Sequence, residues 1–107
     1  MDQKKLDKLK RELAQARRGQ QKAADLESLA KRLGRVSVKR GKEPMWDSSV
    51  FPDLFVLSIP RHGGRDISIG TRNSILDQLE DDILRWEERL SEEEAEQNKK
   101  GDGNGSG

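Results

Sequence analysis

The 107-residue chain contains no cysteine and a single histidine, His62. The absence of cysteine excludes a disulfide framework, thiolate metal ligands and a cysteine nucleophile. A single imidazole excludes a histidine-rich zinc site and any mechanism that needs two histidines. The sequence therefore predicts a protein that works without a metal ion or a small-molecule cofactor.

The chain also has no long apolar stretch. No run approaches the roughly 20 apolar residues of a membrane-spanning helix, so we expect no transmembrane segment. No apolar stretch follows the first residues, Met1-Asp2-Gln3-Lys4-Lys5, and we expect no secretory signal. Hydrophobic residues make up 31% and charged residues 38% of the chain, which fits one small domain with polar helical arms. These features predict a cytoplasmic protein that does not contact a membrane.

The net charge of +1 conceals two oppositely charged halves. Residues 1–46 hold 14 Lys and Arg against 6 Asp and Glu, a net charge of +8. Residues 47–107 hold 7 against 14, a net charge of −7. A basic half of this kind often binds a polyanion such as RNA. The alternative is that the two halves pair with each other or stay solvated.

Three stretches have the apolar periodicity of a helix. Residues 3–18 are expected to end at Gly19, and residues 23–33 at Gly34. The stripe of the first stretch comprises Leu6, Leu9, Leu13 and Ala16. A third helix is predicted for about residues 72–90, with Thr71 as its N-cap. Its apolar stripe comprises Ile75, Leu76, Leu79, Ile83, Trp86 and Leu90, and its acidic face comprises Asp77, Glu80, Asp81, Asp82, Glu87 and Glu88.

Three stretches between these helices predict strands. Residues 35–39 alternate, so we expect Val36 and Val38 to face the core and Arg35 and Lys39 to face outward. Met45-Trp46 is expected to start a short second strand. Residues 54–59 are almost all apolar, which predicts the central strand of the sheet. The order predicts an α+β fold, α-β-β-β-α, in which a three-stranded antiparallel sheet carries two helices on one face, plus an extra N-terminal helix.

The chain divides into three predicted regions. Residues 1–22 are expected to form an N-terminal helical extension, and residues 23–90 the domain. Residues 91–107 are expected to form a disordered tail, because an acidic and glycine-rich segment cannot bury a core. The leucine stripe of the first helix would either cover an edge of the same domain or bind a partner helix.

Three short motifs stand at the connections of this fold. Arg40-Gly41-Lys42 follows the first strand, Ile59-Pro60-Arg61-His62-Gly63-Gly64 follows the third, and Gly70-Thr71-Arg72-Asn73-Ser74-Ile75-Leu76-Asp77-Gln78 opens the last helix. In order and spacing they resemble the HicA family of small mRNA-interferase toxins, over about residues 24–84. The resemblance implies a fold like that of a double-stranded-RNA-binding domain (dsRBD-like) and metal-independent cleavage of mRNA as an endoribonuclease. It also implies neutralisation by a HicB-type antitoxin.

The catalytic histidine of that family belongs in the turn after the first strand, where this chain has Glu43 and Pro44. Metal-free RNA cleavage needs a general base for the ribose 2′-OH and a general acid for the leaving oxygen. The candidates here are Glu43 as base and His62 as acid. The alternative is that Glu43 is a turn residue and His62 a loop residue in a protein that has lost the activity.

Basic residues around the motifs predict a surface that contacts RNA phosphates. The candidates are Arg35, Lys39, Arg40, Lys42, Arg61, Arg65 and Arg72. Free N–H groups at the start of the last helix would add to this surface. The alternative function belongs to a different class: a non-catalytic protein–protein interaction module that binds a partner through the first helix and the acidic last helix.

Overall fold

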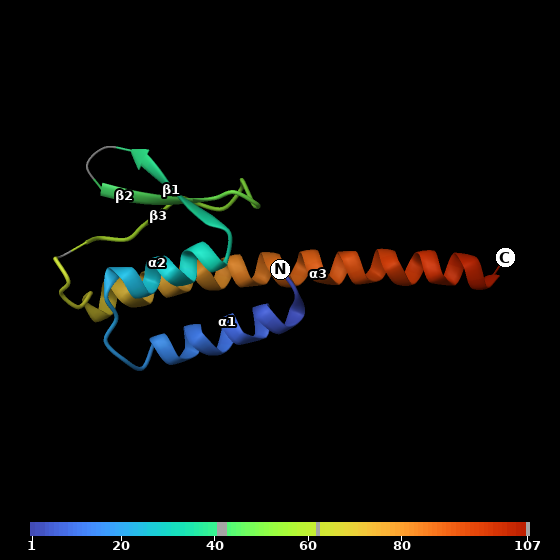
Figure 1. Cartoon of the computed structure of the whole chain (residues 1–107), viewed down its shortest axis with the longest axis horizontal. Helices are drawn as coiled ribbons and strands as arrows, with labels where there is room; N and C mark the ends of the chain where they lie inside the picture. Colours follow the sequence, from blue (N-terminus) through green and yellow to red (C-terminus); the bar gives the residue numbers. More distant parts are fainter. Residues whose placement is uncertain (41–42, 62, 107) are drawn as a thin grey trace.

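The computed structural model describes residues 1–40, 43–61 and 63–106. Its elements are, in chain order, α1 (Gln3–Ala16), α2 (Ala23–Arg32), β1 (Arg35–Arg40), β2 (Glu43–Ser48), β3 (Leu57–Ser58) and α3 (Ile69–Ser106). The strands form an antiparallel sheet in the order β1-β2-β3. The helices lie on one side of this sheet (Figure 1). The predicted α+β class and the order of elements are confirmed.

Helix α1 shares the core of the domain. All four residues of its predicted stripe are buried, and they belong to the same hydrophobic cluster as the side chains of α2, β2 and α3. The helix begins after Asp2, whose carboxylate accepts a hydrogen bond from the backbone N–H of Lys5 at 2.8 Å. It ends at Ala16, before Gly19. The stripe therefore covers its own domain, which was one of the two alternatives.

The connection from α2 into β1 depends on Gly34. Its φ angle is +99°, in the left-handed region that favours glycine after the last turn of a helix. A Cβ atom at this position would lie 3.2 Å from Val50 Cγ2. Gly34 therefore ends α2 as predicted and lets the chain turn directly into the sheet.

The two faces of β1 are the reverse of the prediction. Arg35 is 3% exposed, whereas Val36 is 48% exposed. Arg35 lies opposite Ser48 of β2, which is also buried, and directly opposed residues share a face of the sheet. Alternation in a sequence separates two faces without saying which is inside. Here the buried carboxylate of Asp82 on α3 receives the Arg35 guanidinium, and this pair puts Arg35 inside.

Strand β3 is shorter than predicted and lies at an edge of the sheet. Its two residues pair with Met45 and Trp46 of β2, so β2 is the central strand. The first part of the apolar run 54–59 forms a loop. Leu57 and Ile59 are fully buried and belong to the same hydrophobic cluster as the side chains of the helices. An edge strand can therefore be as apolar as a central one when its side chains pack into the core.

Helix α3 begins at Ile69, earlier than predicted, so Thr71 is inside its first turn rather than at the N-cap. Ser68 precedes the helix, and its hydroxyl donates a hydrogen bond to Thr71 Oγ1 at 3.0 Å. The predicted apolar stripe is confirmed. Its buried members are Ile75, Leu76, Leu79, Ile83 and Trp86, and the half-buried Leu90 packs against the same cluster.

At its other end α3 continues to Ser106, where the sequence predicted a disordered tail from residue 91. Glu, Ala and Gln favour helix, and a helix that already exists extends without the cost of nucleation. The side chains of residues 91–97 are all exposed, so this segment projects beyond the core (Figure 1). No helix in the described part of the chain is long and apolar enough to cross a membrane.

Candidate nucleic-acid interface

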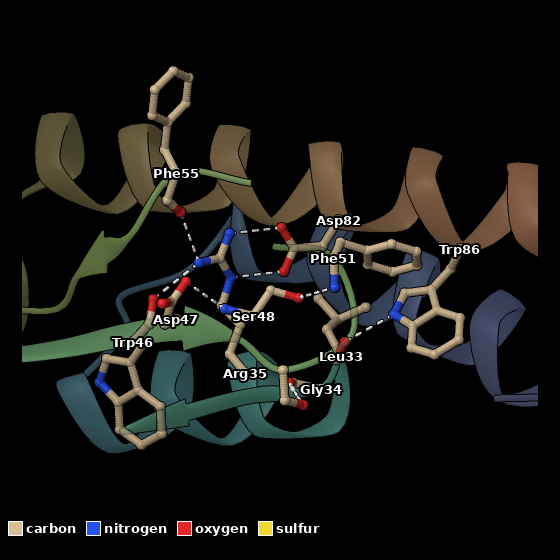
Figure 2. A network of polar contacts seen from close by, with 11 residues as sticks. Leu33, Gly34, Arg35, Trp46, Asp47, Ser48, Phe51, Phe55, Asp82 and Trp86 are labelled. Carbon is tan, nitrogen blue, oxygen red and sulfur yellow. Dashed lines mark hydrogen bonds and ion pairs between the residues drawn. The ribbon is translucent and has the colours of Figure 1, made fainter. Parts of the chain in front are cut away.

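Arg35, a predicted RNA contact, lies inside the domain. Its Nε and Nη2 donate hydrogen bonds to Asp82 Oδ2 and Oδ1 at 2.7 and 2.8 Å. Its Nη1 donates to the carbonyl oxygens of Trp46 and Phe55, both at 2.9 Å (Figure 2). The side chains of Arg35 and Asp82 are each 1% exposed. The expected place of Arg35 on an outer basic face is therefore wrong, and its guanidinium cannot reach a phosphate at the surface.

Asp82 was expected on the acidic outer face of the last helix, and it is buried instead. Burial raises the pKa of Asp82 above its ordinary value, while the hydrogen bonds from Arg35 act in the opposite direction. The two parallel bonds from one guanidinium give this pair a fixed geometry. Through Arg35, the pair joins α3 to β1, β2 and the loop that leads to β3.

Arg72 is also a structural residue. It is 8% exposed, and its Nη1 donates to the carbonyl oxygen of Gly19 at 2.8 Å. Its Nε and Nη2 donate to Asn73 Oδ1 at 3.2 and 3.0 Å. Arg72 therefore ties the start of α3 to the connection between α1 and α2, and its expected place on an exposed first turn is corrected.

Arg61 and Arg65 lie at the surface of the loop between β3 and α3. The Arg61 side chain is 65% exposed, and its Nη2 lies 3.0 Å from Oε2 of the buried Glu27. Arg65 is exposed and has no hydrogen bond or ion pair with the described residues. The structure describes the side chains of four predicted RNA contacts, Arg35, Arg61, Arg65 and Arg72. Of these four, Arg65 is the one without a partner among the described residues, so its guanidinium is available to a ligand.

Arg65 borders a hollow at the start of α3. The hollow is lined by Gly63, Arg65, Asp66, Ile67, Ser68 and Thr71. Gly63 and Gly64 have φ angles of +58° and +85°, which shape the loop before Arg65. No acidic side chain lies in the first turn of α3, and the N–H groups there carry partial positive charge. Arg65 and these N–H groups attract an anion, and the Asp66 carboxylate in the same lining opposes one.

The two candidate catalytic residues are described only in part. The backbone of Glu43 lies in β2, opposite Arg40, so Glu43 is a strand residue and not a turn residue. The side chains of Glu43, Lys39 and Arg40, together with Lys42 and His62, lie outside the described residues. The pairing of Glu43 with His62 and the contacts of these three cations remain predictions.

The basic and acidic halves of the chain pair with each other between α1 and α3. Lys10 Nζ lies 2.5 Å from Glu87, and Arg17 Nη2 lies 2.6 Å from Asp77 and 3.0 Å from Glu80. The hydrogen bond to Glu87 raises the pKa of Lys10, and the hydrogen bond to Asp77 raises that of Arg17. Intramolecular pairing therefore accounts for part of the charge asymmetry.

Sequence reasoning missed the Arg35–Asp82 pair, although a signal for it exists. Asp82 stands three residues after Leu79 and four before Trp86, so helical spacing puts it inside the apolar stripe. A carboxylate on such a stripe needs a buried cation, and Arg35 sits at the start of a strand. The pattern could have located Asp82 but not its partner.

Three comparisons with known proteins gave no match. No protein-family model matches the chain, and neither the curated proteins nor the solved structures gave a match. In the described ranges, no three His, Asp or Glu side chains gather as ligands for a metal ion.

Proposed function

We propose that the chain is a HicA-like, RNA-binding protein of a toxin–antitoxin system, acting on mRNA in the cytoplasm and neutralised by a HicB-type antitoxin. The observation that supports it is the position of the motif segments. The hairpin ends of β1 and β2, the loop residues 59–61 and 63–66, and the start of α3 lie toward the same end of the long axis, away from the C-terminus (Figure 1). Segments distant in sequence are thus available to one stretch of RNA backbone.

The contacts would be made to phosphates. The hollow beside Arg65 and the N–H groups at the start of α3 would hold one phosphate, and Arg61 would extend the basic surface along the same loop. Lys39, Arg40 and Lys42, at the hairpin, would contact phosphates further along the strand. Proteins bind A-form RNA largely through such backbone contacts and its shape. Arg35 and Arg72 would instead hold the scaffold that presents this surface.

Cleavage is the second part of the proposal. Glu43 would remove the proton from the ribose 2′-OH, whose oxygen would attack the adjacent phosphorus. His62 would donate a proton to the leaving 5′-oxygen as the bond between that oxygen and phosphorus breaks. Glu43 is the first residue of β2, and His62 follows Arg61 in the sequence. The reaction needs no metal ion.

Binding is tested by titrating labelled double-stranded and single-stranded RNA with the protein at several salt concentrations. We expect an affinity that falls steeply with salt, because cations that contact phosphates release counterions. Arg65→Ala should weaken binding to both RNAs. Arg11→Ala is the matched control, because Arg11 is an exposed arginine of α1 that lies outside the motifs and has no ion pair with the described residues. RNA affinity that is absent, or equal in these two variants, contradicts the proposal.

Cleavage is tested by induced expression in a bacterium that lacks an antitoxin, with growth and mRNA integrity followed together. The proposal predicts growth arrest and mRNA fragments, both lost in Glu43→Gln and in His62→Ala while RNA binding persists. A protein that binds RNA and leaves growth and mRNA unchanged would retain the binding function and refute the assignment of Glu43 and His62.

A further inference from the structure

Phe55 has the most exposed large apolar side chain of the described residues, at 88%. Leu84, on α3, is 56% exposed. Both line one hollow between the β2–β3 connection and α3, whose other lining residues are Asp53, Leu54, Asp81, Arg85 and Glu88. We call these seven residues the Phe55–Leu84 surface. Leu84 also lines a second hollow, between α1 and α3, so the apolar area extends past it along α3.

The position of Phe55 is fixed from inside the domain. Its carbonyl oxygen accepts the hydrogen bond from Arg35 Nη1, and Arg35 is held by the buried carboxylate of Asp82 on α3. Figure 2 shows the Phe55 ring pointing away from this network. The chain just before it is also tied down, because the N–H of Leu54 donates to the carbonyl oxygen of Phe51 at 3.1 Å. An exposed aromatic on a fixed backbone loses little freedom on binding.

Acidic groups surround this apolar centre. The rim contains three carboxylates, of Asp53, Asp81 and Glu88, against the single guanidinium of Arg85. Arg85 pairs with Asp53 and lies 3.9 Å from Glu88, so Asp81 keeps its charge uncompensated among these residues. Asp81, Leu84 and Glu88 follow one another at helical spacing on the exposed side of α3. The surface is apolar at its centre and negative at its edge.

We propose that the Phe55–Leu84 surface is a docking site for a basic amphipathic helix of another protein. Aliphatic side chains of that helix would contact Phe55 and Leu84, and its flanking Lys or Arg would pair with Asp81 and Glu88. The acidic rim disfavours RNA, whose phosphates it would repel. It also disfavours a second copy of this chain as donor, because the basic helix α1 already buries its leucines against its own domain.

This site is separate from the proposed RNA surface. The connection that carries Phe55 follows β2 at the end of the sheet opposite the β1–β2 hairpin (Figure 1). The motif segments lie at the hairpin end. Helix docking at Phe55 and RNA binding can therefore be measured separately. A variant at one site can also be tested for its effect on binding at the other.

The test uses two labelled synthetic peptides and fluorescence anisotropy on the full chain. One peptide is a helix of Leu and Lys with Leu at helical spacing, and in the other Glu replaces every Lys. We expect the Leu–Lys peptide to bind and the Leu–Glu peptide not to bind. Phe55→Ala and Leu84→Ala should each weaken binding about tenfold or more, as truncation of a central anchor does. Ile69→Ala is the matched control, because Ile69 is a comparably exposed apolar residue at the start of α3.

Four results would overturn the proposal. The first is equal affinity in all three variants. The second is binding that high salt abolishes and Phe55→Ala leaves unchanged, which indicates general attraction between charges. The third is a dimer of the chain that Phe55→Ala dissociates in sedimentation, which makes a second copy the occupant. The fourth is displacement of the peptide by RNA in a manner that depends on Phe55. If Leu84→Ala lowers the melting temperature, Phe55→Ala alone decides, since its ring makes little contact with the core.

Discussion

At the scale of single residues, the fold depends on an ion pair that has almost no contact with water. Arg35 uses its Nε and both Nη atoms within the domain, two of them on Asp82 and one on two backbone carbonyl oxygens. Taking such groups out of water is costly, and the geometry repays it only while both partners are present. Breaking the pair from one side should therefore harm the protein far more than losing an exposed ion pair.

Asp82→Asn tests this dependence. The change leaves the Arg35 guanidinium buried without a countercharge, so we expect a loss of about 3–5 kcal/mol in the free energy of unfolding. Urea denaturation followed by circular dichroism gives the value. Asp81→Asn is the control, because Asp81 is exposed and its replacement should stay within about 0.5 kcal/mol of the parent. Equal stability of the two variants would mean that Arg35 finds another partner or reaches water.

Removing both charges should behave differently from removing one. In Arg35→Met combined with Asp82→Leu, apolar groups of similar size replace the pair, and no charge stays buried alone. We expect the double variant to be more stable than Asp82→Leu alone, and the two single variants Arg35→Met and Asp82→Leu complete a double-mutant cycle that measures the coupling energy. A double variant as unstable as the sum of the singles would show that the hydrogen bonds to the two carbonyl oxygens matter more than the ion pair.

A second prediction at this scale concerns the missing histidine. If the protein descends from an active ribonuclease, the scaffold around Gly41 should persist, and Glu43→His, alone or with Pro44→His, should restore toxicity to a harmless parent. Growth and mRNA integrity in cells without an antitoxin provide the measurement. A parent that is harmless and remains so after both changes would remove the support for nuclease descent. It would favour the protein-binding function.

At the scale of elements, α3 organises the molecule. One face of it carries the apolar stripe that α1, α2 and the sheet cover, and the exposed face carries Asp81, Leu84 and Glu88. The apolar stripe of α3 could be predicted from the sequence because an amphipathic helix repeats its apolar positions with a period that differs from that of a strand. Strand β3 was misjudged because a short apolar run has no such period. The same run fits a central strand or a loop that the helices bury.

Leu79→Ala and Ile83→Ala should each lower the free energy of unfolding by about 2–5 kcal/mol, the usual cost of a cavity left by a large aliphatic side chain. Leu79 is fully buried and Ile83 is 5% exposed. Chemical denaturation measures both losses. Leu84→Ala serves as the comparison, since Leu84 lies on the exposed face of the same helix and should lose much less. If all three variants unfold alike, the stripe does not form the core of the domain.

At the scale of the whole molecule, α1 packs into the same hydrophobic core as the rest of the chain. Residues 1–22 were expected as an extension, yet the leucines of α1 share one cluster with the rest of the chain. Lys10 and Arg17 add ion pairs to α3, each worth about 0.2–1 kcal/mol because the groups are exposed to water. Helix α1 therefore contributes to the core, and the exposed residues 91–97 of α3 do not.

Two truncations test this boundary. Removing residues 92–107 should leave the melting temperature nearly unchanged, because the described side chains at 92–97 are all exposed. Removing residues 1–18 should abolish cooperative unfolding, because it uncovers the apolar surface of α3 that α1 buries. Thermal unfolding by calorimetry compares the two. A sharp transition retained without α1 would restore the description of residues 1–22 as an appendage.

The sequence by itself determined the class of the fold, the order of elements and the apolar stripes of the first and last helices. These features are local, because the period of a helix and a glycine with a left-handed φ after it depend only on neighbouring residues. The ends of α3 were not determined in this way, and the helix exceeds its predicted limits at both ends because helix propagation depends on propensity as well as on burial.

The tertiary structure decided which charged residues serve the fold and which stay available to a ligand. Arg35, Arg65 and Arg72 look alike in the sequence, but a carboxylate 47 residues away from Arg35 and a carbonyl group 53 residues away from Arg72 take two of them out of the surface. Arg65 has no such partner among the described residues. The same long-range ion pair places Arg35 on the inner face of β1, opposite to the prediction. It also fixes the backbone of Phe55, whose ring lies in solvent. Helical spacing can locate Asp82 on the apolar stripe, but no pattern in the sequence identifies its partner, because only the assembled fold brings the two side chains within hydrogen-bonding distance.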